Sequence, residues 1–471
     1  MEMAGRRDMM LTQTKCEAFF DSLRGRRVAV CGLGRTHIPV AHQFLEHGVQ
    51  VLACDKRDRA SIGAAADGLE QAGAVLKLGE GYLDNLEADL ILRSPGMKPT
   101  LPAFEAARGR GVRVTTEIEL LLELSPAPVY GVTGSDGKTT TTSVVAGLLQ
   151  AAGYTVHLGG NIGWPLLPEI EKIRPEDVVV VELSSFMLQR MERSPQVSVV
   201  TNVAPNHLDW HTDMAEYTDA KRNIVRYQQA SDRAVLNADN TITQGFSEGL
   251  RSDVFRFSRL HEVERGTYLG QDGTLYGRDG GEAVPILPAK EIRLPGSHMV
   301  ENFLAAFAAV WGKVPPAVMG AFARGFGGVP HRCELVRELD GVRWVNDSIG
   351  TSPTRTIAGL RAFGHGVILI AGGYDKHIPY DPLGPVAAET VSAAILMGDT
   401  APAIQAAIRA CSELPIYRVK DMEEAVLTAR RLAEPGEVVF LSPASASFDM
   451  YKDFEERGDH FKRLVTALME G

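Results

Sequence analysis

"GVTGSDGKTTTTSVV", residues 131–145, is the stretch that decides the fold of this chain. A short apolar segment leads into a glycine-rich loop with Lys138 and Thr139, and a segment typical of a helix follows as far as Gly153. Backbone N–H groups at such a helix start bind phosphate, the lysine neutralises charge, and the threonine hydroxyl can bind Mg²⁺. The order of strand, loop, lysine, hydroxyl and helix therefore predicts a nucleotide-phosphate site. The alternative is a glycine turn that only begins a helix.

The loop departs from the general P-loop pattern, G-x-x-x-x-G-K-[ST]. That pattern needs glycine at position 132, where this chain has valine. The turn begins instead at Gly134, two residues later, while Gly137, Lys138 and Thr139 are kept. The shortened loop indicates a particular type of phosphate site, and the rest of the chain has to explain it.

Length and composition bound the possible classes of protein. With 471 residues the chain is long enough for three domains, and its net charge of −10 disfavours nucleic-acid binding as the main activity. Its five cysteines are scattered and form no C-x-x-C pattern, which argues against a disulfide framework or a zinc site. Neither a signal peptide nor a long apolar stretch is evident, so the sequence predicts a cytoplasmic protein without membrane insertion.

Short β-branched runs alternate with helix-like segments almost from end to end. This pattern is typical of parallel sheets covered by helices, and it predicts an α/β fold. A proline-containing segment before residue 131 and the stretch "GFGGVPHRCELV", residues 325–336, predict two domain boundaries. The strands in between end in polar residues, at the edge where open α/β sheets bind their ligands.

Three polar residues near that edge suggest a metal site. Glu182 ends the apolar run 178–181, and a carboxylate at the tip of a buried strand costs desolvation unless a cation or donor meets it. His207 lies just past another strand and can supply an imidazole to the same ion. Each has a plain structural alternative, an exposed strand end or a packed histidine. Lys221 by its local composition is a solvated helix lysine.

The stretch "GLGRTH", residues 32–37, is half of a dinucleotide fingerprint. Gly32 and Gly34 are present, but His37 stands at the third glycine position, and Asp55 follows the second strand at a spacing suited to ribose hydroxyls. The stretch fits a nucleotide-sugar diphosphate as well as it fits NAD, so both ligands stay open on this evidence.

Ten motifs, taken in order, resemble those of the Mur ligase family: "GVTGSDGKTT", "GGNIG", "VELSSFML", "NHLDWH", "YTDAK", "LPGSHMVEN", "GVPHRCE", "NDSIGTSPT", "GGYDK" and "LSPASASFDMYKDFEERG". The resemblance explains the shortened loop as the type that this family carries. It implies three domains: a Rossmann-like UDP-sugar-binding domain (1–115), a central P-loop-type ATPase domain with a mostly parallel sheet (116–328), and a Rossmann-like amino-acid-binding domain (329–471).

Within the family, the resemblance is to members that add D-glutamate to UDP-N-acetylmuramoyl-L-alanine. It implies that ATP phosphorylates the carboxylate of the L-alanyl end and that the D-glutamate amine then attacks the acyl phosphate. Mg²⁺ and Lys138 would offset the charge that repels two anionic reactants. The resemblance also implies a cytoplasmic monomer that acts in peptidoglycan precursor synthesis.

The resemblance assigns roles to residues by motif. For catalysis it implies Lys138, Glu182, His207 and Lys221, the last of them matching the lysine that CO₂ carbamylates in the family. Two Mg²⁺ ions would lie among Thr139, Glu182, His207 and Lys221. The residues implied for ATP are Gly134, Ser135, Asp136, Gly137, Lys138, Thr139, Thr140, Asn302, Arg332 and Asp347.

Two further sets are implied for the substrates. The set for the UDP-sugar comprises Gly34, Arg35, Thr36, Asp55, Lys56, Arg57, Ser94, Gly96 and Asn161. The set for D-glutamate comprises Thr351, Lys376, Ser447 and Phe454, with Lys376 offering a charge for the side-chain carboxylate.

Several positions depart from the family pattern. Met299 and Ile349 stand where asparagine and lysine are common, and Asp136 brings a negative charge to the phosphate loop. Ser352 and Ser445 replace a frequent asparagine and cysteine. Two alternatives remain at this point: a related ligase with another amino-acid acceptor, and a nucleotide-binding protein that has lost catalysis.

Overall fold

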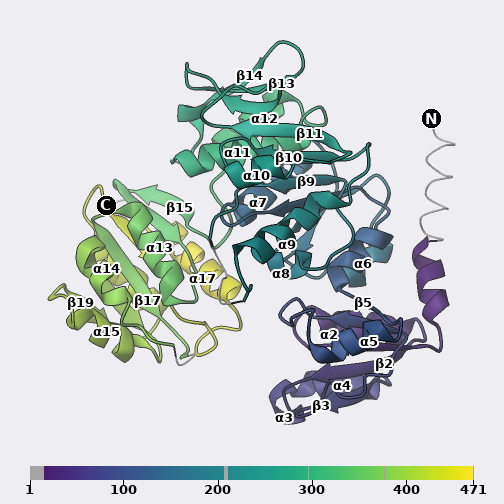
Figure 1. Cartoon of the computed structure of the whole chain (residues 1–471). Helices are drawn as coiled ribbons and strands as arrows, with labels where there is room; N and C mark the ends of the chain where they lie inside the picture. The colour runs from purple at the N-terminus through teal and green to yellow at the C-terminus, as the bar shows by residue number, and fades with distance from the viewer. Residues whose placement is uncertain (1–14, 206–209, 295, 376–377, 470–471) are drawn as a thin grey trace. The chain divides into compact units, whose positions relative to one another are not determined.

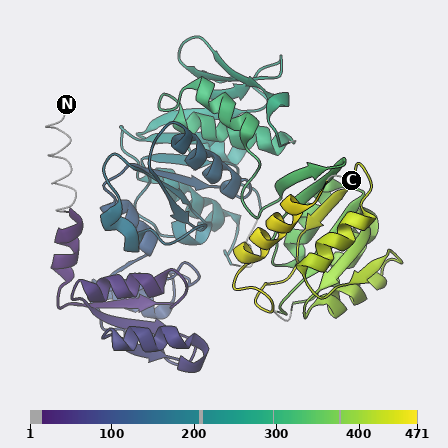
Figure 2. The ribbon, with the colours of Figure 1, turned by 180° about the vertical axis from the view of Figure 1, so that it is seen from behind.

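The computed structural model describes residues 15–205, 210–294, 296–375 and 378–469. It confirms the predicted α/β class: the chain forms three domains, each built on one sheet, and most of the strand pairs are parallel. Two compact units, residues 1–325 and 326–471, divide the chain, and the first carries two of the sheets (Figures 1 and 2). Within the described ranges no helix is long and apolar enough to cross a membrane.

The N-terminal sheet has the all-parallel strand order β3-β2-β1-β4-β5. Val28 and Val30 of β1 face a core formed with α2 and α4, whereas Ala29 and Cys31 face the other side, which α5 covers. The alternation follows from the two-residue period of a strand. The elements are β1 (Arg27–Cys31), α2 (His37–Glu46), β2 (Gln50–Asp55), α3 (Arg59–Ile62), α4 (Ala64–Gln71), β3 (Val75–Leu78), β4 (Leu90–Arg93), α5 (Pro102–Gly109) and β5 (Arg113–Thr115).

The central sheet has nine strands in the order β14-β13-β12-β11-β10-β9-β6-β8-β7, antiparallel only at β12-β13-β14. α7 packs against α11 and α12. The elements before the sheet's hairpin are α6 (Glu117–Leu124), β6 (Val129–Thr133), α7 (Lys138–Ala151), β7 (Val156–Gly160), η1 (Leu167–Lys172), β8 (Val178–Glu182), α8 (Ser185–Leu188), β9 (Val197–Val200), α9 (Met214–Arg226), β10 (Arg233–Asn237) and α10 (Thr241–Gly245). They are followed by β11 (Asp253–Ser258), β12 (Arg265–Leu269), β13 (Thr274–Asp279), β14 (Val284–Pro288), η2 (Ala289–Glu291), α11 (Ser297–Val310) and α12 (Pro316–Gly325).

The C-terminal sheet, in the order β15-β16-β20-β17-β18-β19, is antiparallel only at β15-β16. Leu369 of β17 faces a core shared with α13, α14 and α15, while its neighbours Ile368 and Ile370 face α16 and α17. The elements are β15 (Glu334–Leu339), β16 (Val342–Asn346), α13 (Pro353–Phe363), β17 (Val367–Gly372), α14 (Leu383–Thr390), β18 (Val391–Met397), α15 (Ala401–Arg409), β19 (Ile416–Arg418), α16 (Met422–Leu432), β20 (Val438–Leu441) and α17 (Phe454–Ala467).

The start of α6 brings a carboxyl group into the interior of the first unit. Thr116 caps the helix by accepting a hydrogen bond from the N–H of Glu119 at 3.2 Å. The neighbouring Glu117 is only 5% exposed, and its Oε1 accepts a hydrogen bond from the N–H of Leu167 at 3.1 Å. Burial raises the pKa of Glu117 to about 7, because a buried charge loses its hydration.

This pKa shift makes the stability of the chain depend on pH. Between the ordinary value of 4.5 and about 7, the folded chain binds a proton at Glu117 that the unfolded chain has released. The free energy of unfolding therefore falls as the pH rises through this window, by about 2–3 kcal/mol. We predict that Glu117→Gln removes this fall, so that the variant is more stable than the wild type at pH 8.

Urea unfolding followed by circular dichroism at pH 5 and pH 8 measures this difference. Glu87→Gln, at an exposed position, removes a charge without a buried carboxyl and serves as the control. An unchanged pH dependence in Glu117→Gln would contradict the prediction.

Candidate functional site

The glycine-rich loop joins β6 to α7 and contains two positions, Gly134 and Gly137, that no other residue type fits. Gly134 has φ 153° and Gly137 has φ 76°, both conformations that L side chains rarely adopt. A Cβ at Gly134 would lie 1.8 Å from Oγ1 of Thr201, and one at Gly137 would lie 2.4 Å from Oδ1 of Asn302. The loop is therefore held close to the end of β9 and to α11. Gly137 directly precedes α7, so the N–H groups of the helix start lie where the sequence predicts phosphate.

The end of β9 fixes the shape of this loop through polar side chains. Oδ1 of Asn202 accepts a hydrogen bond from the N–H of Asp136 at 2.9 Å, and Oγ1 of Thr201 donates to the Asp136 carbonyl at 2.6 Å. Ser135 donates from Oγ to the carbonyl of Ala204 at 2.8 Å. These contacts give the shortened loop an external template, which explains how it keeps a defined shape without a glycine at position 132.

Two lysines meet at the carbonyl oxygen of Gly134. Lys138 donates from Nζ to this oxygen at 3.1 Å and to the carbonyl of Ser135 at 2.9 Å. Lys221, on α9, donates to the same Gly134 oxygen at 2.7 Å and is 1% exposed. The prediction of a solvated lysine from local composition is therefore wrong: this side chain lies inside the site, with Nζ 4.8 Å from the ring centroid of Tyr217.

Burial, and next the positive charge of Lys138, hold the pKa of Lys221 well below its usual range. Desolvation and a like charge both disfavour the ammonium form. The neutral amine is the nucleophilic form of lysine, so this environment favours chemistry at Nζ.

Glu182 ends β8, beside Val132 of β6, and is 1% exposed. Its Oε1 accepts a hydrogen bond from Nδ2 of Asn161 at 2.7 Å, and its backbone carbonyl accepts from the Asn161 N–H at 2.8 Å. Its buried Oε2 has no hydrogen-bond partner among the described residues. A buried carboxylate oxygen in this state fits a cation, because a bare charge in the interior is costly.

The other proposed metal ligands are only partly placed. Thr139 is buried in the first turn of α7. His207 lies outside the described residues, and in the part of the chain that the structure describes no three His, Cys, Asp or Glu side chains converge as a metal cluster. The described donors that fit Mg²⁺ are thus the Glu182 carboxylate and the Thr139 hydroxyl, since oxygen ligands are those that Mg²⁺ prefers.

In the N-terminal domain, Asp55 and Arg57 brace the first glycine-rich turn. Asp55, 5% exposed, accepts hydrogen bonds from the N–H of Leu33 at 2.7 Å and from Nε of Arg57 at 3.0 Å. Burial opposes ionisation of Asp55, but the hydrogen bonds from Arg57 and Leu33 outweigh it and lower the pKa. Arg57 also donates to the Leu33 carbonyl at 2.7 Å. The pair fixes the turn in which the resemblance places the diphosphate.

The remaining predicted UDP-sugar residues lie around the same turn. Gly34 and Thr36 precede α2, and Lys56 is exposed after β2. Gly96 lies in the turn closed by the hydrogen bond from the Met97 N–H to the Ser94 carbonyl at 3.0 Å. These positions agree in place with the predicted set, though their contacts with a ligand stay a prediction.

Trp164 is a residue that the sequence did not single out. The guanidinium of Arg35 lies 4.6 Å from the Trp164 ring centroid, and Arg35 donates to the Gly163 carbonyl at 3.1 Å. Trp164 is 69% exposed and follows Asn161 by three residues. The contact joins two predicted substrate motifs, "GLGRTH" and "GGNIG", and only its position directly after the second motif could have suggested it.

In the second unit, Asp347 follows β16 and anchors the loop before β15. Oδ2 accepts a hydrogen bond from Oγ of Ser442 at 2.8 Å, and Oδ1 accepts from the N–H of Cys333 at 3.2 Å. Burial raises the pKa of Asp347 to about 6, although these hydrogen bonds and the charge of Arg332 oppose the rise. Arg332 and Asp347, both assigned to the nucleotide by the resemblance, thus lie in one locally bonded segment.

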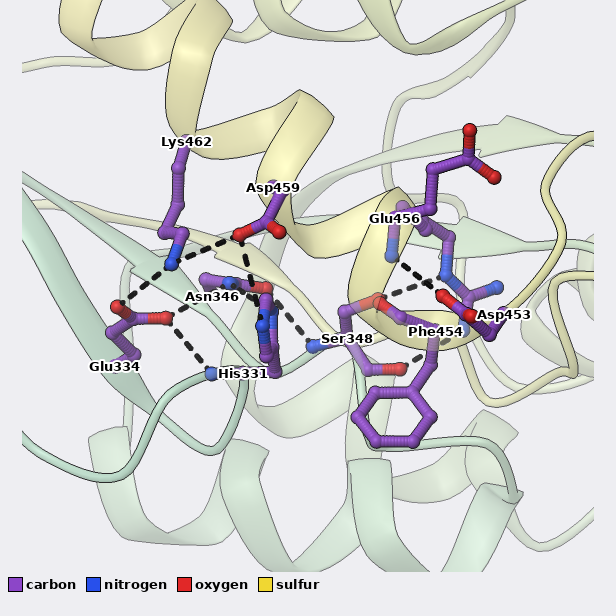
Figure 3. Close-up of polar contacts among 10 residues, drawn as sticks. His331, Glu334, Asn346, Ser348, Asp453, Phe454, Glu456, Asp459 and Lys462 are labelled. Atoms are coloured by element: carbon purple, nitrogen blue, oxygen red, sulfur yellow. Dashed lines mark hydrogen bonds and ion pairs between the residues drawn. The ribbon is translucent and has the colours of Figure 1, made fainter. Parts of the chain in front are cut away.

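The D-glutamate residues lie at loops beside the same sheet. Thr351 precedes α13, and Ser447 is buried, with its carbonyl accepting the N–H of Tyr451 at 2.8 Å. Phe454 begins α17, and its carbonyl accepts a hydrogen bond from Oγ of Ser348 at 2.8 Å (Figure 3). Lys376 lies outside the described residues, so its predicted role is not placed.

The residues that depart from the family pattern make ordinary local contacts. Met299 is buried in α11, Asp136 is exposed on the loop, and Ile349 donates from its N–H to the His331 carbonyl at 3.1 Å. Ser352 precedes α13 as its N-cap. Ser445 is fully buried and shares hydrogen bonds with the hydroxyls of Tyr380 at 2.9 Å and Thr400 at 2.8 Å, so a hydroxyl satisfies its surroundings.

Comparison with known proteins assigns all three domains to one class. The Mur ligase MurD-like N-terminal domain matches residues 26–116, the Mur ligase middle domain matches residues 132–310, and the Mur ligase glutamate ligase domain matches residues 331–445. The fold agrees: a UDP-N-acetylmuramate-alanine ligase from Thermotoga maritima matches with a TM-score of 0.54 at 18% identity, covering 94% of this chain and 99% of that one.

Curated relatives match nearly the whole chain. A UDP-N-acetylmuramoylalanine–D-glutamate ligase from Acetivibrio thermocellus is 50% identical over 463 residues, covering 97% of this chain and 99% of that protein. A ligase of the same name from Symbiobacterium thermophilum is 48% identical, covering 94% and 98%. The chain belongs to the Mur ligase family, and it is accordingly an ATP-dependent enzyme that forms an amide bond.

The geometry of the loop generates a direct test. We predict that Gly134→Ala loses at least tenfold in affinity for ATP, because its Cβ would collide with Thr201 and displace the loop that carries Lys138. Binding of the non-hydrolysable analogue AMP-PNP with Mg²⁺, measured by calorimetry, gives the change. Gly153→Ala, beyond the end of α7, replaces a glycine with φ 91° that has open space around it, and it controls for backbone strain alone. Equal affinities in the two variants would contradict the account.

Proposed function

We propose that this ligase joins D-glutamate to UDP-N-acetylmuramoyl-L-alanine, converting ATP to ADP and phosphate, as a step in peptidoglycan precursor synthesis. One observation carries the proposal: the helix start, two lysines and a buried carboxylate gather at the ends of β6 and β8, in a chain up to 50% identical to relatives named for that reaction. Residue roles below are proposals that this geometry supports.

The proposed chemistry has two steps. An oxygen of the L-alanyl carboxylate attacks the γ-phosphorus of ATP, and ADP leaves. The D-glutamate amine then attacks the acyl carbon, loses a proton, and displaces phosphate from the tetrahedral intermediate. Phosphorylation is needed because a carboxylate is a poor acyl donor, and positive charge near the transferred group lowers the barrier.

Lys138 is proposed to contact the β- and γ-phosphates together with the loop from Gly134 to Thr140. Its ammonium already points into the loop, towards the carbonyls of Gly134 and Ser135. Arriving phosphate oxygens offer a stronger, charge-assisted acceptor than these neutral carbonyls. Asn302, Arg332 and Asp347 are each proposed as a further contact of the nucleotide.

Glu182, Thr139 and His207 are proposed to hold two Mg²⁺ ions. The unpartnered Oε2 of Glu182 supports a cation at this place. When bound, Mg²⁺ would screen phosphate charge and orient the γ-phosphoryl group. Asn161 would then have two tasks: it orients the Glu182 carboxylate through Oε1 and contacts the muramoyl substrate.

Lys221 is proposed to carry a carbamate. Its buried amine with a lowered pKa supports addition of CO₂: the neutral nitrogen bonds the carbon and releases a proton, and the carbamate anion that forms attracts Lys138. The new carboxylate would accept a hydrogen bond from Lys138 or face a metal ion.

The substrate sets follow the motifs. Arg35, Asp55, Arg57 and Ser94 are proposed for the uridine diphosphate, with Gly34, Thr36, Lys56 and Gly96 around them. Thr351, Lys376, Ser447 and Phe454 are proposed for D-glutamate. The domain boundaries at 115/116 and 328/329, the cytoplasmic location and the monomeric state stay predictions.

The reaction is tested by phosphate release from ATP with purified protein, Mg²⁺ and UDP-N-acetylmuramoyl-L-alanine. We expect release that depends on D-glutamate and stays at background with L-glutamate, L-lysine or meso-diaminopimelate. Release with another amino acid would assign a different acceptor, and no release with any would point to a nucleotide binder without catalysis.

The carbamate is tested by chemical rescue. We expect Lys221→Ala to lose at least a hundredfold in turnover and to regain part of it when acetate or propionate is added, because only the negative group is replaced. Lys138→Ala, which lacks the phosphate-binding ammonium, should be equally inactive and gain nothing from the acid. Normal turnover of Lys221→Ala would remove this residue from the mechanism.

A further inference from the structure

The loop before β15 places Arg332 between two strained residues. His331 has φ 61° and Cys333 has φ 43°, in the left-handed region that disfavours side chains with a Cβ. The N–H of Arg332 donates to the Val329 carbonyl at 3.0 Å, which closes a turn with His331 at its third position. Glycine or asparagine usually occupies that position in a turn of this type. The surroundings must therefore hold His331 in place.

Hydrogen bonds of the His331 side chain and backbone keep the residue in this conformation. Its N–H donates to Oε2 of Glu334 at 2.8 Å, and its Nδ1 lies 3.2 Å from Nδ2 of Asn346. The same Asn346 nitrogen donates to Oε2 of Glu334 at 3.1 Å, while Oδ1 of Asn346 accepts the Ser348 N–H at 3.1 Å. These two bonds fix which way the amide points, so Nδ1 of His331 accepts the hydrogen bond and the proton of the neutral ring is on Nε2.

α17 completes the arrangement from the other side. Lys462 bridges Oε1 of Glu334 at 3.3 Å and Oδ1 of Asp459 at 3.1 Å, and Asp459 lies 3.7 Å from Nε2 of His331 (Figure 3). Lys462 thus joins the two carboxylates that flank the ring. Gly458 lies against the ring itself: a Cβ there would be 2.1 Å from Nδ1 of His331.

We propose that Lys462 and Gly458 are positioning residues for the nucleotide: they hold His331 in its strained turn and thereby fix the place of Arg332. The inference rests on the proposed role of Arg332 as a phosphate contact. Neither residue is proposed to touch ATP.

The ammonium group of Lys462 lies between the two carboxylates and separates their charges from the ring. Without it, Glu334 and Asp459 keep their negative charges on two sides of the ring with no cation between them. Protonation of His331 would then offset one of these charges, but a proton on Nδ1 would face the donor Nδ2 of Asn346, and that contact would break. The ring would leave its place and the turn that presents Arg332 would relax.

Titration of the ring gives a second readout. Burial, and next the charge of Lys462, lower the pKa of His331, so that the ring is neutral at pH 7. The charged groups that face the ring are Glu334 on β15 and Glu455, Asp459 and Lys462 on α17. Removal of Lys462 raises the pKa of His331, and nucleotide binding by that variant should weaken further as the pH falls from 8 to 6.

The experiment measures binding of AMP-PNP with Mg²⁺ to the full chain by calorimetry. We expect Lys462→Met and Gly458→Ala to bind about fivefold to tenfold more weakly than the wild type, and Lys462→Arg to bind within about twofold of it. The Gly458→Ala variant is informative, because alanine ordinarily stabilises a helix relative to glycine. Weaker binding would then come from the contact with His331 and not from a less stable helix. Arg463→Met removes a positive charge from an exposed neighbouring position on α17 and should bind as the wild type does at each pH.

A double-mutant cycle separates positioning from general damage. Arg332→Met should weaken AMP-PNP binding, and Lys462→Met should add little to it, because both changes remove the same contact. Losses that add in full, or wild-type binding by Lys462→Met and Gly458→Ala, would overturn the proposal. So would an equal loss of affinity for UDP-N-acetylmuramoyl-L-alanine, whose proposed contacts lie in the first unit.

The test does not depend on the amino-acid acceptor. A protein that shows this binding pattern but releases no phosphate with D-glutamate would contradict the proposed function and leave the inference standing. The reverse result, D-glutamate-dependent turnover with unchanged nucleotide binding in Lys462→Met and Gly458→Ala, would overturn the inference alone.

Discussion

The carbonyl oxygen of Gly134 accepts hydrogen bonds from Nζ of two lysines, Lys138 from the loop and Lys221 from α9. Two ammonium groups there would repel each other, and the cost would be large because Lys221 is buried, so burial and the charge of Lys138 hold the pKa of Lys221 low. Phosphate at the loop, and an anion on Lys221, each remove this repulsion. The site therefore suits the negative charge that its substrates and a carbamate would bring. The buried Oε2 of Glu182, which has no hydrogen-bond partner among the described residues, likewise suits a cation.

Buried arginines play a related part away from the reacting groups. Arg93, 2% exposed, donates to the carbonyls of Met97 at 2.9 Å and Gln189 at 3.1 Å. Arg457, fully buried, donates to the carbonyls of Ser348 and Ala446, each at 2.9 Å. Burial lowers the pKa of each to about 10, yet both stay charged at neutral pH. A weakly hydrated, forked cation can satisfy several loop carbonyls at once, so Arg457 joins the two loops that carry Thr351 and Ser447, and Arg93 joins the turn with Ser94 and Gly96 to the end of α8.

Much of the fold followed from sequence patterns, because periodicity and turn chemistry are local. The run ending at Glu182 is a strand, and α7 ends at Ala151, two residues before the glycine that predicted its end. The phosphate loop was identified from the spacing of its own residues. Such local patterns could not predict contacts between segments that lie far apart in the sequence. Thr201 and Asn202 shape the loop from another strand, and Trp164 meets Arg35 across two motifs. Lys221 is the sharpest case, since nothing in its helix distinguishes a buried lysine from a solvated one.

In the proposed mechanism, ATP activates the L-alanyl carboxylate before the amine of D-glutamate attacks. Transfer of ¹⁸O tests it most directly, with UDP-N-acetylmuramoyl-L-alanine labelled in both carboxylate oxygens and the released phosphate analysed by mass spectrometry. We expect one ¹⁸O atom in each phosphate formed in the presence of D-glutamate, because the oxygen that attacks phosphorus leaves with it. Phosphate free of ¹⁸O, formed together with the amide product, would contradict an acyl-phosphate intermediate.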